Sequence, residues 1–130
     1  MFFEQNAKKR KRNNRDISQK NEKENKVYVC EKEEKGAKYA KTGYRVIKKT
    51  DEGILTEVEL FTGRTHQIRA HMAHIGCPIS GDVKYGAEKD GKKTYQDLTS
   101  FKVLFDFDGD EKTHLSYLSG KYFTITQKNF

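Results

Sequence analysis

The sequence has little of what a secreted or membrane protein needs. Its 130 residues include two cysteines, Cys30 and Cys77, which lie far apart in the chain. A disulfide framework needs more cysteines than this, so we expect free thiols and a cytoplasmic protein. No stretch approaches the roughly 18 apolar residues that cross a membrane. The N-terminus also lacks an apolar segment before a small-residue cleavage site, so we expect no secretory signal and no membrane partner.

Apolar residues are scarce as well. Hydrophobic residues make up 34% of the chain and charged residues 35%, whereas globular proteins typically have about 45–50% and about 25%. Residues 1–26 hold nine Lys or Arg and four acids, which is +5 of the net charge of +7. Residues 4–26 have no hydrophobic periodicity, so we expect residues 1–26 to be a disordered basic tail. This tail is either a solvated linker or a segment that binds RNA phosphates.

The sequence after residue 26 has the periodicity of a folded domain, which we expect to cover residues 27–130. Ile54, Thr56 and Val58 recur at every second position, the pattern of a strand with one buried face. The regular strand and helix alternation of a doubly wound sheet is absent, so we predict an α+β class with a mostly antiparallel sheet and two short helices. The expected elements are strands in residues 27–30, 44–47, 54–61, 101–107 and 122–126, a hairpin turn at 51–53 and a second helix at 115–118.

One helix is marked by its apolar spacing. Ile68, Met72 and Ile75 stand at i, i+4 and i+7, on one face of a short helix. Thr65 is the expected N-cap, and Gly76 fits the left-handed position that follows a helix. The single proline of the chain comes two residues after this glycine, where a helix has already ended.

The start of this helix carries the residues most suited to chemistry. After Gly63, the first turns present Arg64, His66, Gln67 and Arg69. Unpaired N–H groups and the positive end of the helix dipole favour anions, and two arginines extend that preference. The pattern therefore indicates a phosphate or other anion site. The other interpretation is a helix whose arginines pair with surface carboxylates.

A metal site is a weaker interpretation of the same region. His66, His71, His74 and Cys77 are spaced so that some of them share a helix face. A tetrahedral site needs a second ligand pair, and the chain has neither that pair nor an H-E-x-x-H motif. We expect hydrogen-bonded helix histidines and no metal, and a small metal-binding protein is the least favoured alternative.

Residues 63–86 as a whole read GRTHQIRAHMAHIGCPISGDVKYG. This run resembles the C-terminal signature of the RluA-type pseudouridine synthases, G-R-[TS]-H-Q-[IL]-R-x-H, a short spacer and G-x-P-[IL]-x-G-D-x-x-Y-G. A weaker similarity extends over about residues 25–127. The resemblance implies part of a pseudouridine synthase catalytic fold. It also implies an RNA-modifying isomerase that acts on uridine in rRNA or tRNA, and that needs no cofactor.

The resemblance also implies roles for single residues. Arg69 matches the arginine that pairs with the family's nucleophilic aspartate, so we expect it to support catalysis. A guanidinium beside a carboxylate favours the ionised form and holds its orientation. For Arg64, His66 and Gln67 we expect contacts that hold the loop together and touch the RNA. The G-D-x-x-Y-G residues are expected to form a structural turn, with the tyrosine as packing; they are Gly81, Asp82, Tyr85 and Gly86.

The family's nucleophile has no counterpart in these residues. It lies in an H-R-L-D-x-x-T-S-G segment, and Asp16, in Asn-Arg-Asp-Ile-Ser, does not match it. We therefore expect the C-terminal part of a catalytic domain, inactive alone, whose partner is the N-terminal half. We expect Arg69 to be left unpaired and able to bind an anion. A non-catalytic basic RNA-binding module is the alternative.

Overall fold

The computed structural model describes residues 11–17, 25–30, 35–89, 91, 93, 95–107 and 114–125. These residues divide into two compact units, residues 1–98 and residues 99–130. Each unit is described by itself. Within the described residues, no helix is both long enough and apolar enough to cross a membrane.

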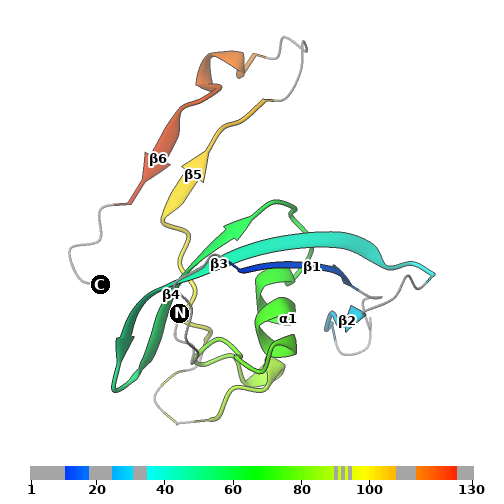
Figure 1. Ribbon diagram of the computed structural model, residues 1–130, viewed down its shortest axis with the longest axis vertical. Coiled ribbons are helices and arrows are strands. Elements are labelled where there is room, and N and C mark those ends of the chain that lie inside the picture. Colours follow the sequence, from blue (N-terminus) through cyan, green and yellow to red (C-terminus); the bar gives the residue numbers. More distant parts are fainter. Residues whose placement is uncertain are drawn as a thin grey trace. The chain divides into compact units, whose positions relative to one another are not determined.

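The first unit is built on a four-stranded antiparallel sheet (Figure 1). In the order of the sheet, its strands are β2 (Val29–Cys30), β1 (Lys11–Ile17), β3 (Lys38–Thr50) and β4 (Gly53–Leu60). β3 and β4 form a long hairpin in which Thr50 pairs with Gly53 across a two-residue turn. The predicted hairpin is therefore confirmed, and β3 is longer than the predicted run at residues 44–47.

β1 corrects one expectation from the sequence. Residues 11–17 lie within the segment predicted to be disordered, yet they pair with β3 from Lys11 opposite Tyr44 to Ile17 opposite Lys38. A strand that pairs on both sides satisfies its backbone N–H and C=O groups through the ladder. This pairing does not depend on an apolar period in the strand itself, so composition gave no sign of it. The remaining residues of the predicted tail before Asn25 lie outside the described residues.

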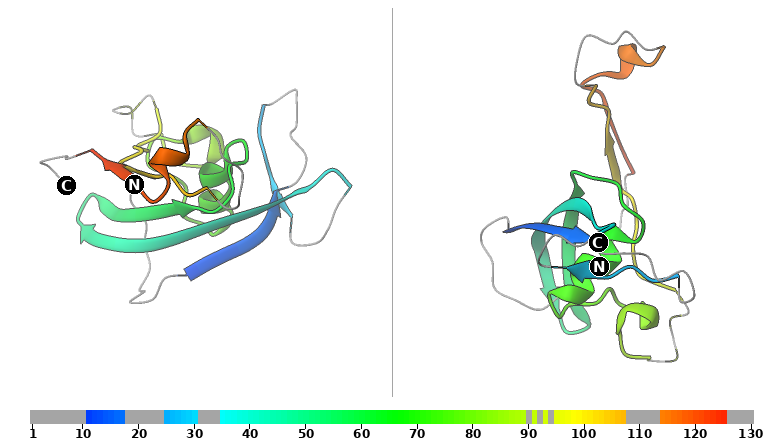
Figure 2. Two further views of the ribbon diagram at one scale, coloured as in Figure 1. Left: turned by 90° about the horizontal axis from the view of Figure 1, so that it is seen from above. Right: turned by 90° about the vertical axis from the view of Figure 1, so that its right-hand side faces the viewer.

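Helix α1 (Gln67–His74) lies against one face of this sheet (Figures 1 and 2). Met72 is fully buried with Ile54 of β4 and with Ile79, and Ile68 and Ile75 pack against this cluster. The predicted apolar face of the helix is therefore confirmed. Buried Ile54 and Thr56 also confirm the predicted inner face of β4.

The C-terminal end of α1 is where the sequence predicts it, and the N-terminal end is not. The N-cap is His66, with a left-handed φ of 52°, so the helix begins one residue later than predicted. Gln67, and not Thr65, supplies the side-chain hydrogen bonds of the loop before the helix. At the other end Gly76 has a φ of 80°, as its predicted C′ position requires.

A second buried cluster joins four separate parts of the chain. Val27, Ala40 of β3, Ala70 of α1 and Tyr85 pack together. Tyr85 ends the short 3₁₀ helix η1 (Val83–Tyr85). The packing role predicted for Tyr85 is confirmed, and the cluster fixes η1 beside α1.

The second unit is a two-stranded antiparallel hairpin, β5 (Lys102–Leu104) with β6 (Tyr122–Thr124), joined through the 3₁₀ helix η2 (Ser116–Leu118). The rings of Phe105 and Phe123 meet edge to face, 5.8 Å apart. Both strands are shorter than predicted, and the predicted second helix at 115–118 is the single 3₁₀ turn η2. The described chain is thus α+β, with small antiparallel sheets and one α-helix.

Candidate active-site arginine and its surroundings

The loop before α1 is held together by Gln67. Its amide oxygen accepts hydrogen bonds from the Thr62 hydroxyl (2.8 Å) and the Arg64 backbone N–H (3.0 Å). Its amide nitrogen donates to the Lys41 carbonyl (3.0 Å) and the Thr42 hydroxyl (2.8 Å). One side chain therefore ties the loop to β3.

This arrangement decides between the two roles expected for Gln67. The residue is only 3% exposed, and both ends of its amide are engaged within the protein. A buried amide of this kind stabilises the loop because its partners would otherwise lose their hydrogen bonds. Gln67 thus holds the loop together, and its burial leaves no surface for contact with RNA.

The histidines of α1 are also part of the packing. Nδ1 of His71 lies 2.7 Å from the Thr42 hydroxyl, and the residue is 1% exposed. Nδ1 of His66 lies 3.0 Å from the Tyr85 hydroxyl. Among the residues that the structure describes, no three His, Cys, Asp or Glu side chains gather as a metal site.

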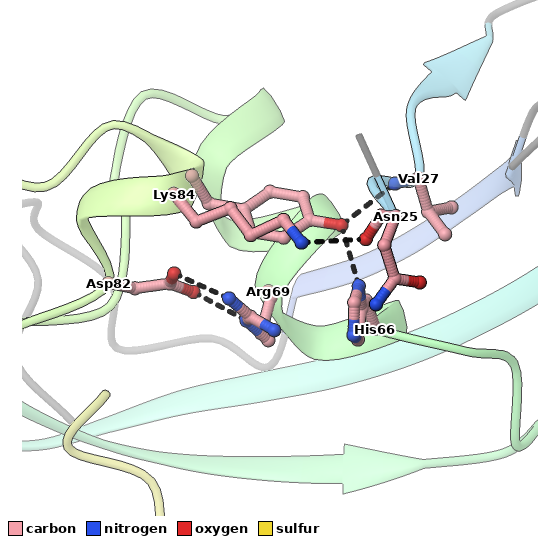
Figure 3. A network of polar contacts seen from close by, with 7 residues as sticks. Asn25, Val27, His66, Arg69, Asp82 and Lys84 are labelled. Carbon is pink, nitrogen blue, oxygen red and sulfur yellow. Dashed lines mark hydrogen bonds and ion pairs between the residues drawn. The ribbon is translucent and has the colours of Figure 1, made fainter. Parts of the chain in front are cut away.

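Arg64 and Arg69 point to different surroundings. Arg64 is exposed, and its Nε donates to the Tyr39 carbonyl at 3.0 Å. The side chain of Arg69 is 15% exposed and forms a two-pronged ion pair with Asp82 (Figure 3). Nε lies 2.7 Å from one carboxylate oxygen, and Nη2 lies 2.8 Å from the other. Arg69 therefore pairs with a carboxylate of its own chain, and an anion site at Arg64 stays a prediction.

Tyr85 completes the surroundings of Arg69. The guanidinium carbon lies 4.7 Å from the centre of the Tyr85 ring, within the range of a cation–π contact. The Tyr85 hydroxyl accepts a hydrogen bond from the Val27 backbone N–H at 2.9 Å. Tyr85 thus links η1 to Arg69 of α1 through its ring, and to Val27, just before β2, through its hydroxyl. The Val27 N–H and the His66 ring both contact this hydroxyl (Figure 3).

The ionisation states follow from these contacts. The hydrogen bonds that Arg69 donates to the Asp82 carboxylate raise the pKa of Arg69 above its usual value, against a smaller lowering by burial. Burial raises the pKa of Tyr85, which therefore stays protonated at neutral pH. Arg69 carries a permanent positive charge, and Tyr85 presents a neutral ring to it.

The turn that carries Asp82 depends on Gly81. Gly81 has a φ of 78°, and a Cβ atom there would overlap the backbone carbonyl oxygen of Tyr95. We expect Gly81→Ala to lower the free energy of unfolding by at least ~2 kcal/mol, since left-handed strain alone costs about 1–3 kcal/mol. Urea denaturation measures this change. Gly63→Ala is the matched control, because no atom lies within 4 Å of its Cβ position; equal effects at both sites would contradict the prediction.

Sequence reasoning found Arg69 but missed its partner. It predicted Asp82 to be part of a structural turn, whereas the carboxylate holds the guanidinium. Arg69 is therefore not left unpaired, which corrects that expectation. One signal for a shared role of Asp82 and Tyr85 was present in the sequence. They are three residues apart, and on a 3₁₀ turn side chains at i and i+3 lie on the same side.

Comparison with known proteins gives the family of this chain. Residues 2–74, more than half of the chain, match the family model described as RNA pseudouridylate synthase. The chain belongs to this family. The match ends at the last residue of α1, so Asp82 and Tyr85 lie beyond it.

Individual relatives match over shorter segments. The chain is 50% identical over 52 residues to the uncharacterized RNA pseudouridine synthase YlyB of Bacillus subtilis, covering 40% of the chain and 17% of the relative. It is 53% identical over 49 residues to ribosomal large subunit pseudouridine synthase D of Pseudomonas aeruginosa, covering 38% and 15%. It is 39% identical over 61 residues to the mitochondrial tRNA pseudouridine(32) synthase of Saccharomyces cerevisiae, covering 47% and 13%. The matched segments thus span 13–17% of the lengths of these relatives.

Proposed function

We propose that this chain is the C-terminal part of the catalytic domain of a cytoplasmic RNA pseudouridine synthase that isomerises uridine in rRNA or tRNA. The observation that carries the proposal is the ordered, charged Arg69 at the family motif. In this proposal Arg69 supports catalysis, and a polypeptide with the H-R-L-D-x-x-T-S-G segment supplies the nucleophilic aspartate. The relatives named for rRNA and tRNA support RNA as the substrate class.

The chemistry needs a carboxylate and a cation close together. The aspartate bonds to the ribosyl carbon as the bond from that carbon to N1 of uracil breaks, and the freed uracil rotates. C5 of uracil then bonds to the same carbon as the aspartate leaves as a carboxylate, and the C5 proton is lost while N1 gains a proton. A positioned arginine keeps such a carboxylate ionised and oriented. The isomerisation moves no electrons to or from a cofactor, so the reaction as proposed requires none.

The RNA-facing surface in this proposal includes Arg64 and His66. The exposed guanidinium of Arg64 uses Nε to reach Tyr39, and its remaining N–H groups suit a phosphate. His66 is the N-cap of α1, two residues after Arg64, and is only partly buried. Phosphate contacts of this kind position an RNA without reading its sequence.

Complementation tests the proposal directly. The chain is mixed with an upstream half from the same family that carries the aspartate segment, and pseudouridine is measured in added rRNA and tRNA. We expect product with the wild-type chain and none with Arg69→Ala. Arg45→Ala is the matched control, because Arg45 pairs with Glu57 at an exposed site. Stable association and RNA binding without product would favour the alternative, a non-catalytic RNA-binding module.

The basic N-terminal segment gives a separate prediction. If Lys8, Lys9 and Arg10 contact phosphates, replacing all three by Gln should weaken binding to single-stranded RNA and reduce its dependence on salt. Each lost contact lowers the slope of log affinity against log salt by about 0.7. These three residues precede β1, so the change leaves that strand intact. Fluorescence anisotropy at several salt concentrations measures the slope, and an unchanged slope would place the contacts on the folded body.

A further inference from the structure

We propose that Asp82 is the positioning residue for Arg69, so that this guanidinium holds two carboxylates at once. The inference rests on the proposed function and extends it to a residue outside the G-R-T-H-Q-I-R motif. Asp82 fixes one edge of the guanidinium, and another edge receives the nucleophilic aspartate.

The geometry of the guanidinium supports this division. A guanidinium has five N–H groups in one plane. Asp82 takes one from Nε and one from Nη2, which together form one edge of that plane. Among the described residues, none accepts a hydrogen bond from Nη1. The edge formed by Nη1 and the second N–H of Nη2 is therefore available to a second carboxylate with the same two-pronged geometry.

Asp82 is not itself suited to attack a substrate. Its side chain is 1% exposed, and both carboxylate oxygens are bound to Arg69. A nucleophile must reach the ribosyl carbon of the RNA. Burial and pairing leave Asp82 the task of holding Arg69, and the reacting carboxylate has to come from elsewhere.

The backbone around Asp82 is fixed well enough for this task. The Asp82 N–H donates to the Ile79 carbonyl at 2.9 Å, and its own carbonyl accepts from the N–H groups of Tyr85 (3.0 Å) and Ala87 (3.1 Å). The next turn of η1 places Tyr85 against the face of the same guanidinium. One short segment thus restrains Arg69 at an edge and at a face, and leaves the other edge open.

Two measurements on the 130-residue chain and on the complemented enzyme test this inference. In the chain alone, we expect the Arg69 Nε–H to give a resolved nuclear magnetic resonance signal that exchanges slowly with water. Asp82→Asn should make this exchange fast while the backbone spectrum stays that of the folded chain. In the complemented enzyme, Asp82→Asn should lower kcat by about 100-fold, the effect of a misplacement of about 1 Å. The KM for RNA should stay within about twofold.

The controls separate positioning from folding. Val83→Ala changes an exposed residue on the same turn and should leave kcat unchanged. In an Arg69→Ala background, Asp82→Asn should cause no further loss, because its effect passes through Arg69. If Asp82→Asn does not fold, Asp82→Glu keeps the charge but moves the carboxylate, and it should lower kcat with KM preserved.

The outcomes that overturn the inference are distinct. A folded Asp82→Asn enzyme with kcat within about threefold of wild type would overturn the role of Asp82 alone. The same holds if both Asp82→Asn and Asp82→Glu raise KM and leave kcat unchanged. A wild-type chain that binds the upstream half and makes no pseudouridine would instead overturn the proposed function, and the inference with it.

Discussion

Pure chain, incubated in excess with RNA containing 5-tritiated uridine, should release no tritium above background. Formation of the C–C glycosidic bond displaces the hydrogen on C5 of uracil, so release reports the reaction. Arg69 lies in an ion pair with Asp82, and in the proposed function the nucleophilic aspartate comes from another polypeptide. Removing the nucleophile from such a set of residues typically removes nearly all of the rate.

The complemented enzyme provides the positive control for this result. Its release should be lost on Arg69→Ala and unaffected by Arg45→Ala. Release by the pure chain that reaches one equivalent and is lost on Arg69→Ala would show that a carboxylate of this chain acts as the nucleophile. Asp82 is too buried for that role, so such a result would point to another carboxylate of this chain and contradict the proposal that a second polypeptide supplies the nucleophile.

A second large effect is expected at Gln67. Gln67→Ala removes four hydrogen bonds at once, to Lys41, Thr42, Thr62 and Arg64. Leaving a buried donor or acceptor unpaired costs about 1–3 kcal/mol. We therefore expect the free energy of unfolding to fall by ~3 kcal/mol or more, a large share of the ~5–15 kcal/mol typical of a domain.

Urea denaturation monitored by circular dichroism measures this loss. Arg45→Ala serves as the control, because exposed ion pairs contribute at most about 1 kcal/mol. The difference between the two variants should exceed 2 kcal/mol by these two estimates. Equal stabilities would show that water replaces the amide and that the loop does not depend on Gln67.

The parts of the fold that sequence predicted are those with a local signal. The β3–β4 hairpin and the apolar face of α1 follow from periods of two and of 3.6 residues, and the structure has both. β1 has no such signal, because its place in the sheet comes from backbone pairing with residues far along the chain. Long-range pairing of this kind depends on the whole sheet, and short-range patterns do not contain it.

The site shows the same difference between what local patterns predict and what long-range contacts decide. Arg69 was predicted from its motif, but its pairing with Asp82 depends on a turn 13 residues later folding back onto α1. For Gln67 the family motif implied both a loop-holding role and contact with RNA, and the structure shows the first. Its burial follows from the unpaired backbone groups of the loop and of β3, which need a side chain that both donates and accepts.

The position of Asp82 and Tyr85 after residue 74 sets a practical limit on dissecting this protein. The family match ends at residue 74, so a boundary drawn there would keep the arginine and discard the carboxylate and the ring that hold it. The Asp82 carbonyl is itself bound by the Ala87 N–H. A shortened version intended to keep the arginine in its native setting must therefore run through residue 87.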